Sequence, residues 1–178
     1  GGPYYGEDNL GDEAILYSIL LNIKKLNFKG TVIIITNKFQ KHKDFDFEIK
    51  TIKIWDYVGK IRELLFCDLL ICGGATILSD CPYESLFLVK YAKRFRKKVI
   101  IYGVGMDEIY DNEMKDFIRK YVKKADLITV RDNDVKKRLL DLGVKKQKLF
   151  LTADPVFDYK PEEKYHDSEF FDLGQKLA

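Results

Sequence analysis

The sequence predicts an α/β fold in which a parallel sheet is flanked by helices. Short β-branched segments alternate along the chain with longer segments whose apolar residues recur at helical spacing. Several of the short segments are continuously apolar, as strands are when a parallel sheet is covered on both faces. Alternating strands and helices build βαβ units with right-handed crossovers. The expected architecture is therefore Rossmann-like.

Six short segments are the expected strands. They are rich in valine, isoleucine, leucine and threonine. The second of them alternates polar and apolar residues, which favours an edge strand. The expected strands are Thr31–Thr36, Glu48–Trp55, Asp68–Cys72, Val99–Val104, Asp126–Val130 and Lys148–Thr152.

Five segments have the apolar spacing of helices, one before the first expected strand and four between later strands. The first runs from about Gly11 to Asn27, and Gly143 is expected to end the fifth at the C′ position. The apolar faces of the second, third and fourth consist of Val58, Ile61, Leu64 and Leu65, of Phe87, Leu88, Tyr91, Ala92 and Phe95, and of Met114, Phe117, Ile118, Tyr121 and Val122.

The chain is expected to form one Rossmann-like domain over residues 1–158, followed by a linker or short terminal helix over residues 159–178. Pro161 and the charged residues around it mark this change. No strand precedes the first helix, although a doubly wound domain usually opens with one. We therefore expect the place of that strand to be empty or taken by another segment. An empty place would promote strand exchange and a homo-oligomer.

Composition and charge narrow the class of protein. Hydrophobic residues make up 46% and charged residues 33%, as in soluble globular proteins. The 31 basic and 28 acidic residues leave a net charge of +3, and the basic residues are scattered along the sequence, so no nucleic-acid partner is expected. No apolar run is long enough for a membrane span.

The three cysteines, Cys67, Cys72 and Cys81, have neither a disulfide nor a zinc-site spacing. Cys72 is expected in the core, and His42 and His166 at the surface. We therefore expect a reducing cytoplasmic location and no metal.

The loops that follow the predicted strands contain the candidate site, because ligands of open parallel sheets bind there. The loop from Tyr4 to Ala14 combines tyrosines, an amide and carboxylates, as a hydroxyl-rich sugar requires. Asn9 or Asp12 would equally cap the following helix, whose dipole also suits Asp12 and Glu13. From the residues themselves, a sugar site and a simple helix cap are equally supported.

Two further loops place glycines directly after buried strands. Gly73 and Gly74 would let backbone N–H groups approach a ligand, or would simply form a tight turn. Gly103 and Gly105 would allow a similar close approach. Neither loop has the spacing of a dinucleotide or P-loop site.

Charged residues follow the last two strands. Arg131 leaves a buried strand beside a helix amino terminus, where it would hold a carboxylate or phosphate, or form a structural pair with Asp132 or another carboxylate. Asp154, next to the rigid Pro155, would bind a hydroxyl or cap a turn.

Taken in order, these motifs resemble the polysaccharide pyruvyl transferase family. They occupy Tyr4–Ala14, Gly73–Asp80, Tyr102–Gly105, Ala125–Asp132 and Thr152–Pro155. The resemblance implies one half of a GT-B-like architecture, in which two Rossmann-like domains enclose the active site. It implies a transferase that moves pyruvate from phosphoenolpyruvate, as a ketal, onto a sugar of a cell-wall or capsular polysaccharide. Phosphoenolpyruvate is then the donor substrate, and no cofactor is expected.

The resemblance also implies roles for individual residues. The first loop would face the acceptor sugar and Arg131 the anionic donor. Asp12, Glu13 and Arg131 are the candidate catalytic residues, and either carboxylate would orient or deprotonate a sugar hydroxyl. The candidate substrate-binding residues are Tyr5, Asn9, Gly11, Gly73, Gly74, Asp80, Gly103, Asp132 and Asp154.

Some positions depart from the family pattern. Ala75 interrupts the usual glycine run, Asp107 replaces a glycine, and Asp134 adds a negative charge near the expected anion site. The resemblance also implies a carboxyl-terminal domain, missing here, that supplies further donor contacts. We therefore expect this chain by itself to be inactive or weakly active.

Other functions are left open by the sequence. One alternative is a non-catalytic module that binds a glycan or an anion, and another is a domain kept for folding or assembly. A generic nucleotide-binding domain is a more distant alternative. If the acceptor is lipid-linked, the location would be cytoplasmic but peripheral at the inner face of the membrane.

Overall fold

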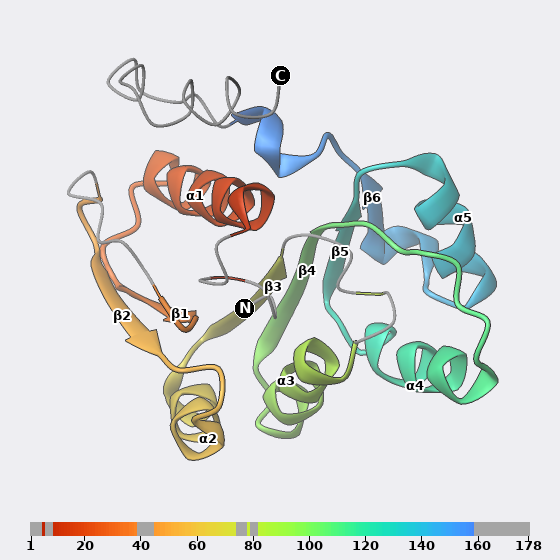
Figure 1. Ribbon diagram of the computed structural model, residues 1–178, viewed down its shortest axis with the longest axis horizontal. Coiled ribbons are helices and arrows are strands. Elements are labelled where there is room, and N and C mark those ends of the chain that lie inside the picture. Colours follow the sequence, from red (N-terminus) through yellow and green to blue (C-terminus); the bar gives the residue numbers. More distant parts are fainter. Residues whose placement is uncertain (1–4, 6–8, 39–44, 74–77, 79–81, 159–178) are drawn as a thin grey trace, which may run out of the picture.

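The computed structural model describes residues 5, 9–38, 45–73, 78 and 82–158. The expected linker or terminal helix at residues 159–178 lies outside the described residues, as do Gly74 and Asp80. Within the described residues the chain is an α/β protein of parallel strands and flanking helices, which confirms the predicted fold class (Figure 1).

Helices and strands follow one another along the chain in the order that the periodicity predicted, with boundaries shifted by a few residues at most. The elements are α1 (Leu10–Lys25), β1 (Thr31–Ile35), β2 (Glu48–Ile52), α2 (Tyr57–Phe66), β3 (Leu69–Gly73), α3 (Tyr83–Arg94), β4 (Lys98–Val104), α4 (Asn112–Val122), β5 (Leu127–Val130), α5 (Asn133–Asp141), the 3-10 turn η1 (Lys146–Lys148), β6 (Leu149–Leu151) and the 3-10 turn η2 (Pro155–Asp158).

All strand pairs are parallel, but they form two sheets. One has the order β1-β2 and the other the order β3-β4-β5-β6. In the part of the chain that the structure describes, no strand lies between β1 and β3 (Figure 1). Among these residues, the place expected for a strand before the first helix is therefore empty.

The strand expected at Glu48–Trp55 is shorter than its alternation suggested. It ends at Ile52 because a turn follows, in which the Asp56 amide donates to the Lys53 carbonyl. Among the described strands β2 pairs with β1 and with no other, so the prediction of an edge strand is confirmed.

Two hydrophobic clusters correspond to the two sheets. The larger one packs α3, α4 and α5 against β3–β6 and includes Cys72, which is fully buried as predicted. The smaller one joins α1 to β1 through Leu16, Leu20 and Ile34. The core is thus divided where the sheet is interrupted.

The predicted apolar face of α2 is partly wrong. Val58 is 82% exposed, Leu65 is also exposed, and Lys60 is buried instead. The helix packs mainly against α3, so a narrow row of its side chains reaches the core. The Lys60 amine lies 4.6 Å from the centre of the Tyr57 ring, and burial lowers the pKa of this amine.

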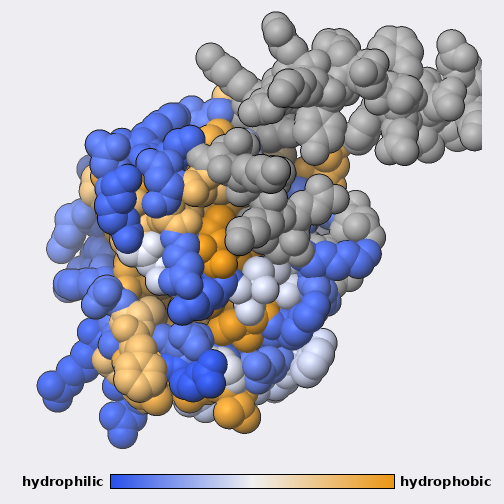
Figure 2. Space-filling model, turned by 90° about the vertical axis from the view of Figure 1, so that its left-hand side faces the viewer, coloured by the Kyte–Doolittle hydropathy of each residue, from blue (hydrophilic) through white to orange (hydrophobic). Residues whose placement is uncertain are grey.

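Figure 2 views the side of the molecule where β2 and α2 lie, and hydrophobic side chains are visible there among hydrophilic ones.

Side-chain caps define where the helices begin. Asn9, Asp56, Asp111 and Asp132 each accept a backbone N–H of the first turn of a helix. Gly143 follows α5 with φ +84°, so its predicted C′ role is confirmed.

None of the helices in the described residues combines the length and the apolar character needed to cross a membrane.

Candidate functional site

The candidate site lies where the parallel strands end. Gly73, Val104, Val130 and Leu151 end β3, β4, β5 and β6, which are neighbours in this order. Neighbouring strands are about 4.8 Å apart, so the tips of β3 and β5 are roughly 10 Å apart. One small ligand can contact both.

Tyr5 links the tips of β1 and β3. Its hydroxyl donates a short hydrogen bond to the carbonyl of Gly73, and its own carbonyl accepts the Thr36 hydroxyl at 2.8 Å. The side chain is 2% exposed, and burial, reinforced by Asp12, raises the pKa of the hydroxyl well above its ordinary value. Tyr5 was a candidate for substrate binding, but the structure shows its hydroxyl engaged in holding the loop.

Gly73 allows α1 to approach the tip of β3. A Cβ atom at this position would lie 2.7 Å from Cδ1 of Ile19 in α1. This contact packs the middle of α1 against the tip of β3. The start of α1 is also near this tip, because Asp12 acts electrostatically on the Tyr5 hydroxyl that bonds to Gly73.

Asn9 is the N-cap of α1. Its side-chain oxygen accepts the amides of Gly11 at 3.0 Å and Asp12 at 3.4 Å, which confirms the capping interpretation. Both Asn9 and Gly11 are exposed. The cap leaves the side-chain amide nitrogen of Asn9 as the group that it can offer to a ligand.

Asp12 is a buried carboxyl group in the first turn of α1. It is 4% exposed, and no described residue donates a hydrogen bond to its carboxylate. Burial, with a smaller contribution from the neighbouring Glu13, raises its pKa. Asp12 therefore accepts a proton more readily than an exposed aspartate does, as an acid–base group requires.

Arg131 is held at the tip of β5 by a carboxylate and a glycine. Its Nη1 lies 2.8 Å from Oδ2 of Asp154, and a Cβ atom on Gly105 would lie 2.6 Å from its Nη2. The guanidinium thus lies across the backbone of Gly105, with 31% of the side chain exposed. The expected structural pair exists, but with Asp154 and not with Asp132, which caps α5 by accepting the Val135 amide at 2.7 Å.

Asp154 and Gly103 have structural contacts at positions expected to bind substrate. The second carboxylate oxygen of Asp154 accepts the Val156 amide at 3.0 Å, so both of its oxygens are engaged. Gly103 has φ +61°, donates its amide to the Thr129 hydroxyl at 2.6 Å and lies against Pro155. Asp154 thus connects the chain after β6 to the tip of β5, and Gly103 lets Pro155 pack against β4.

Three residues at this edge were missed as site residues. Gly105 and Tyr102 belong to the motif at Tyr102–Gly105 but were not among the candidate site residues. Nothing in the sequence marked Asn22 as a candidate, because it lies on a polar face of the predicted first helix. Asn22 donates to Asp158 at 3.0 Å and to the Tyr102 hydroxyl at 3.4 Å, and so connects α1 to η2.

The described residues at this edge comprise a helix cap, a buried carboxyl group and an arginine braced by an aspartate. No group of three or more His, Cys, Asp or Glu side chains among them is arranged to hold a metal ion. Fold and site define a Rossmann-like protein whose described strand tips carry polar groups and the guanidinium of Arg131, at the edge where ligands of open parallel sheets bind.

A family model described as polysaccharide pyruvyl transferase matches residues 9–176, most of the chain. The chain therefore belongs to the polysaccharide pyruvyl transferase family, as its motifs predicted. No curated protein matches the chain. Membership of the family indicates a transferase related to polysaccharides.

Proposed function

We propose that this edge of the sheet binds phosphoenolpyruvate and a glycan for the transfer of pyruvate, as a ketal, onto a cell-wall or capsular polysaccharide. The observation that carries the proposal is the guanidinium of Arg131, which Asp154 holds across Gly105 at the tip of β5. This tip is two strands from the tip of β3, near which Asp12 acts on the Tyr5 hydroxyl. A fixed guanidinium is suited to a carboxylate or phosphate, both of which the donor contains.

Ketal formation requires two proton movements. One sugar hydroxyl adds to the carbon of phosphoenolpyruvate that bears the phosphate, and a proton is delivered to the methylene carbon, which becomes a methyl group. A second hydroxyl then replaces the phosphate, which leaves with the other hydroxyl proton. The overall reaction converts donor and diol into ketal and phosphate without a cofactor.

The described residues suit these steps. The raised pKa of Asp12 allows this group to hold a proton for the methylene carbon and, once ionised, to accept one from a hydroxyl. Asn9 and Gly11 are exposed beside it and can contact the acceptor. Arg131 stabilises the anionic donor and the departing phosphate.

The charge balance at the strand tips limits how well this chain by itself can bind the anionic donor and stabilise the transferring group. Asp154 already neutralises much of the charge of Arg131, whereas the donor carries a carboxylate and a phosphate. We propose that a second protein surface, as in a GT-B-like arrangement, supplies the remaining cations. The same balance favours the second candidate function, a glycan- or anion-binding module without catalysis.

Ligand binding and phosphate release test both functions. Calorimetric titration with phosphoenolpyruvate and saturation-transfer NMR with an acceptor containing ManNAc or galactose measure the two substrates separately. Binding of both, with little phosphate released, is the expected result for this chain. Rapid phosphate release that depends on the acceptor would contradict the need for a second surface, and failure to bind phosphoenolpyruvate would exclude the donor site.

A further inference from the structure

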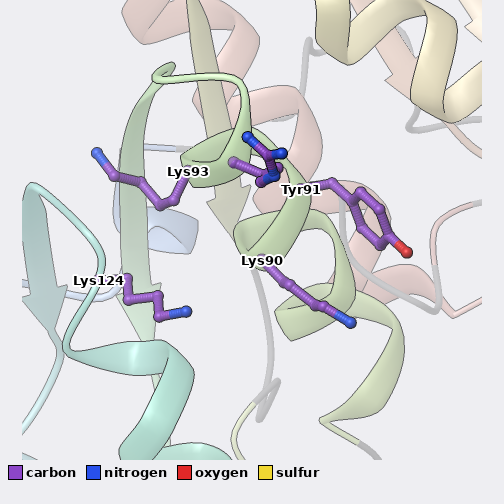
Figure 3. Close-up of a pocket in the computed structure, with 5 residues that line it drawn as sticks. Lys90, Tyr91, Lys93 and Lys124 are labelled. Carbon is purple, nitrogen blue, oxygen red and sulfur yellow. The ribbon is translucent and has the colours of Figure 1, made fainter.

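A basic hollow lies at the opposite end of the sheet from the strand tips. It has a volume of about 490 Å³ and is lined by Lys90, Tyr91, Lys93, Arg94 and Lys124. Figure 3 shows that Lys90, Tyr91 and Lys93 come from α3, whereas Lys124 comes from the turn that follows α4. The carboxyl-terminal half of α3 and the end of α4 thus form its walls.

Most cations of the hollow have no carboxylate partner. Lys93 pairs with Asp126 at 2.9 Å, but no carboxylate of the described residues forms a salt bridge with Lys90, Arg94 or Lys124. These three residues are exposed. The amine of Lys124 lies 4.8 Å from the centre of the Tyr121 ring, a contact that leaves its charge uncompensated.

The fold gathers three basic segments at this end, which we call the basic face: residues 90–98, 120–126 and 143–148. Lys93 donates to the carbonyl of Lys97, which joins the end of α3 to the start of β4. Lys148 donates to the carbonyl of Ala125, which joins the start of β6 to the start of β5. Because the strands are parallel, these starts all lie at one edge.

The basic face concentrates the positive charge of the protein. It contains twelve of the 31 basic residues but one of the 28 acidic residues, Asp126. Its formal charge is therefore +11, and that of the rest of the chain is −8, which together give the net +3. In the sequence these residues are scattered, so this concentration of charge was not predicted.

Helix dipoles account for a small part of this charge. Lys93 and Arg94 lie in the last turn of α3 and complement its carboxyl terminus. Lys123 is the C-cap of α4 and is favoured by its dipole in the same way. Arg96 to Lys98, Lys124 and Lys145 lie outside the helices, and Lys146 and Lys148 belong to the short 3-10 turn η1.

We propose that the basic face binds an anionic phospholipid surface, with the headgroup phosphates against the exposed amines and guanidinium around the hollow. Ten of its twelve cations are lysines, which act as mobile point charges suited to a fluid anionic surface. Nucleic-acid recognition relies more on arginine forks and stacked aromatic rings, whereas the face has two arginines. The inference does not depend on pyruvyl transfer.

Co-sedimentation with vesicles tests the proposal. The 178-residue chain is mixed with vesicles of phosphatidylcholine, with or without phosphatidylglycerol. It should bind the anionic vesicles, and salt should weaken binding because it screens the charges. Each basic residue near such a surface contributes about 1 kcal/mol, so Lys90→Gln/Arg94→Gln/Lys124→Gln should weaken binding by on the order of 100-fold.

The matched control is Lys50→Gln/Lys53→Gln/Lys137→Gln, which removes three exposed charges from β2, the turn after it and α5. Its binding should change several-fold at most. Equal losses in both variants, or no binding to anionic vesicles, would overturn the proposal. So would saturable binding of inorganic phosphate without vesicle binding, or tighter binding of an oligonucleotide at the same salt concentration.

Discussion

The hydroxyl of Tyr5 donates a hydrogen bond to the backbone carbonyl of Gly73, 68 positions later in the chain. The carbonyl of Tyr5 accepts the Thr36 hydroxyl, so this residue joins the tips of two strands that belong to separate sheets. Tyr5, which precedes Asn9 and Asp12 in the sequence, is thereby attached to the larger sheet.

Tyr5→Phe should destabilise the protein. The change leaves the Gly73 carbonyl without this donor in a buried setting, which costs about 1–3 kcal/mol in unfolding free energy. Chemical denaturation measures the loss. Tyr110→Phe is the control, because this tyrosine is 81% exposed and the loss of its hydroxyl should cost less than about 0.5 kcal/mol. Equal losses would show that the Tyr5 bond contributes little.

Arg131→Ala should weaken phosphoenolpyruvate binding and leave glycan binding unchanged. Hydrogen bonds to a charged group contribute about 1.5–3 kcal/mol, so the dissociation constant should rise by roughly 10- to 150-fold. Calorimetric titration measures both ligands. Arg119→Ala, which removes an exposed guanidinium paired with Asp116, is the control. Unchanged donor affinity in Arg131→Ala would exclude a donor role.

Gly105→Ala should misplace the guanidinium without removing its charge. The new Cβ atom would lie 2.6 Å from Nη2 of Arg131, and the φ of Gly105 lies outside the left-handed region, so the backbone accepts alanine. We expect donor affinity to fall by about 10-fold, in keeping with the loss of one hydrogen bond. In the Arg131→Ala background the same change should have no further effect, and an additive loss would contradict the positioning role.

Asp12→Asn should stabilise the protein at neutral pH and abolish any transfer activity. Burial raises the pKa of Asp12 above its ordinary 3.8, so the folded state is penalised above the folded pKa, where this group is ionised. The penalty disappears below pH 3.8, where the group is protonated in both states, so the stability gain of the variant should shrink as the pH falls. Thermal unfolding across this range measures it.

The exposed Asp107→Asn is the control, for which we expect a change within about 0.5 kcal/mol at every pH. A variant Asp12→Asn that is less stable than the wild type at neutral pH would show that the carboxylate is stabilised by its surroundings.

The parts of the fold that local patterning determines were predictable from the sequence. The apolar runs of β4 and β5 and the repeat of α4 gave elements within a few residues of those observed, and Asn9 and Gly143 had recognisable capping chemistry. Such features depend on neighbouring residues along the chain, so one sequence is enough to reveal them.

Contacts between distant residues could not be predicted in this way. Arg131 has an adjacent carboxylate in Asp132, yet it pairs with Asp154, because the parallel β5 and β6 bring their tips together. The burial of Lys60 and the gathering of the basic face have the same origin. In each case strand order and helix packing determine which residues become neighbours, and the local spacing of residues in the sequence does not encode this.

The division of the core between two sheets has a consequence for local unfolding of the molecule. Backbone ladders connect β3 through β6, whereas β1 and β2 are joined to them by side chains and by Tyr5. The smaller cluster also buries fewer residues than the larger one. Amide protons of β1 and β2 should therefore exchange with deuterium sooner than those of β4 and β5, because the part of the molecule with α1 can unfold while the rest stays intact.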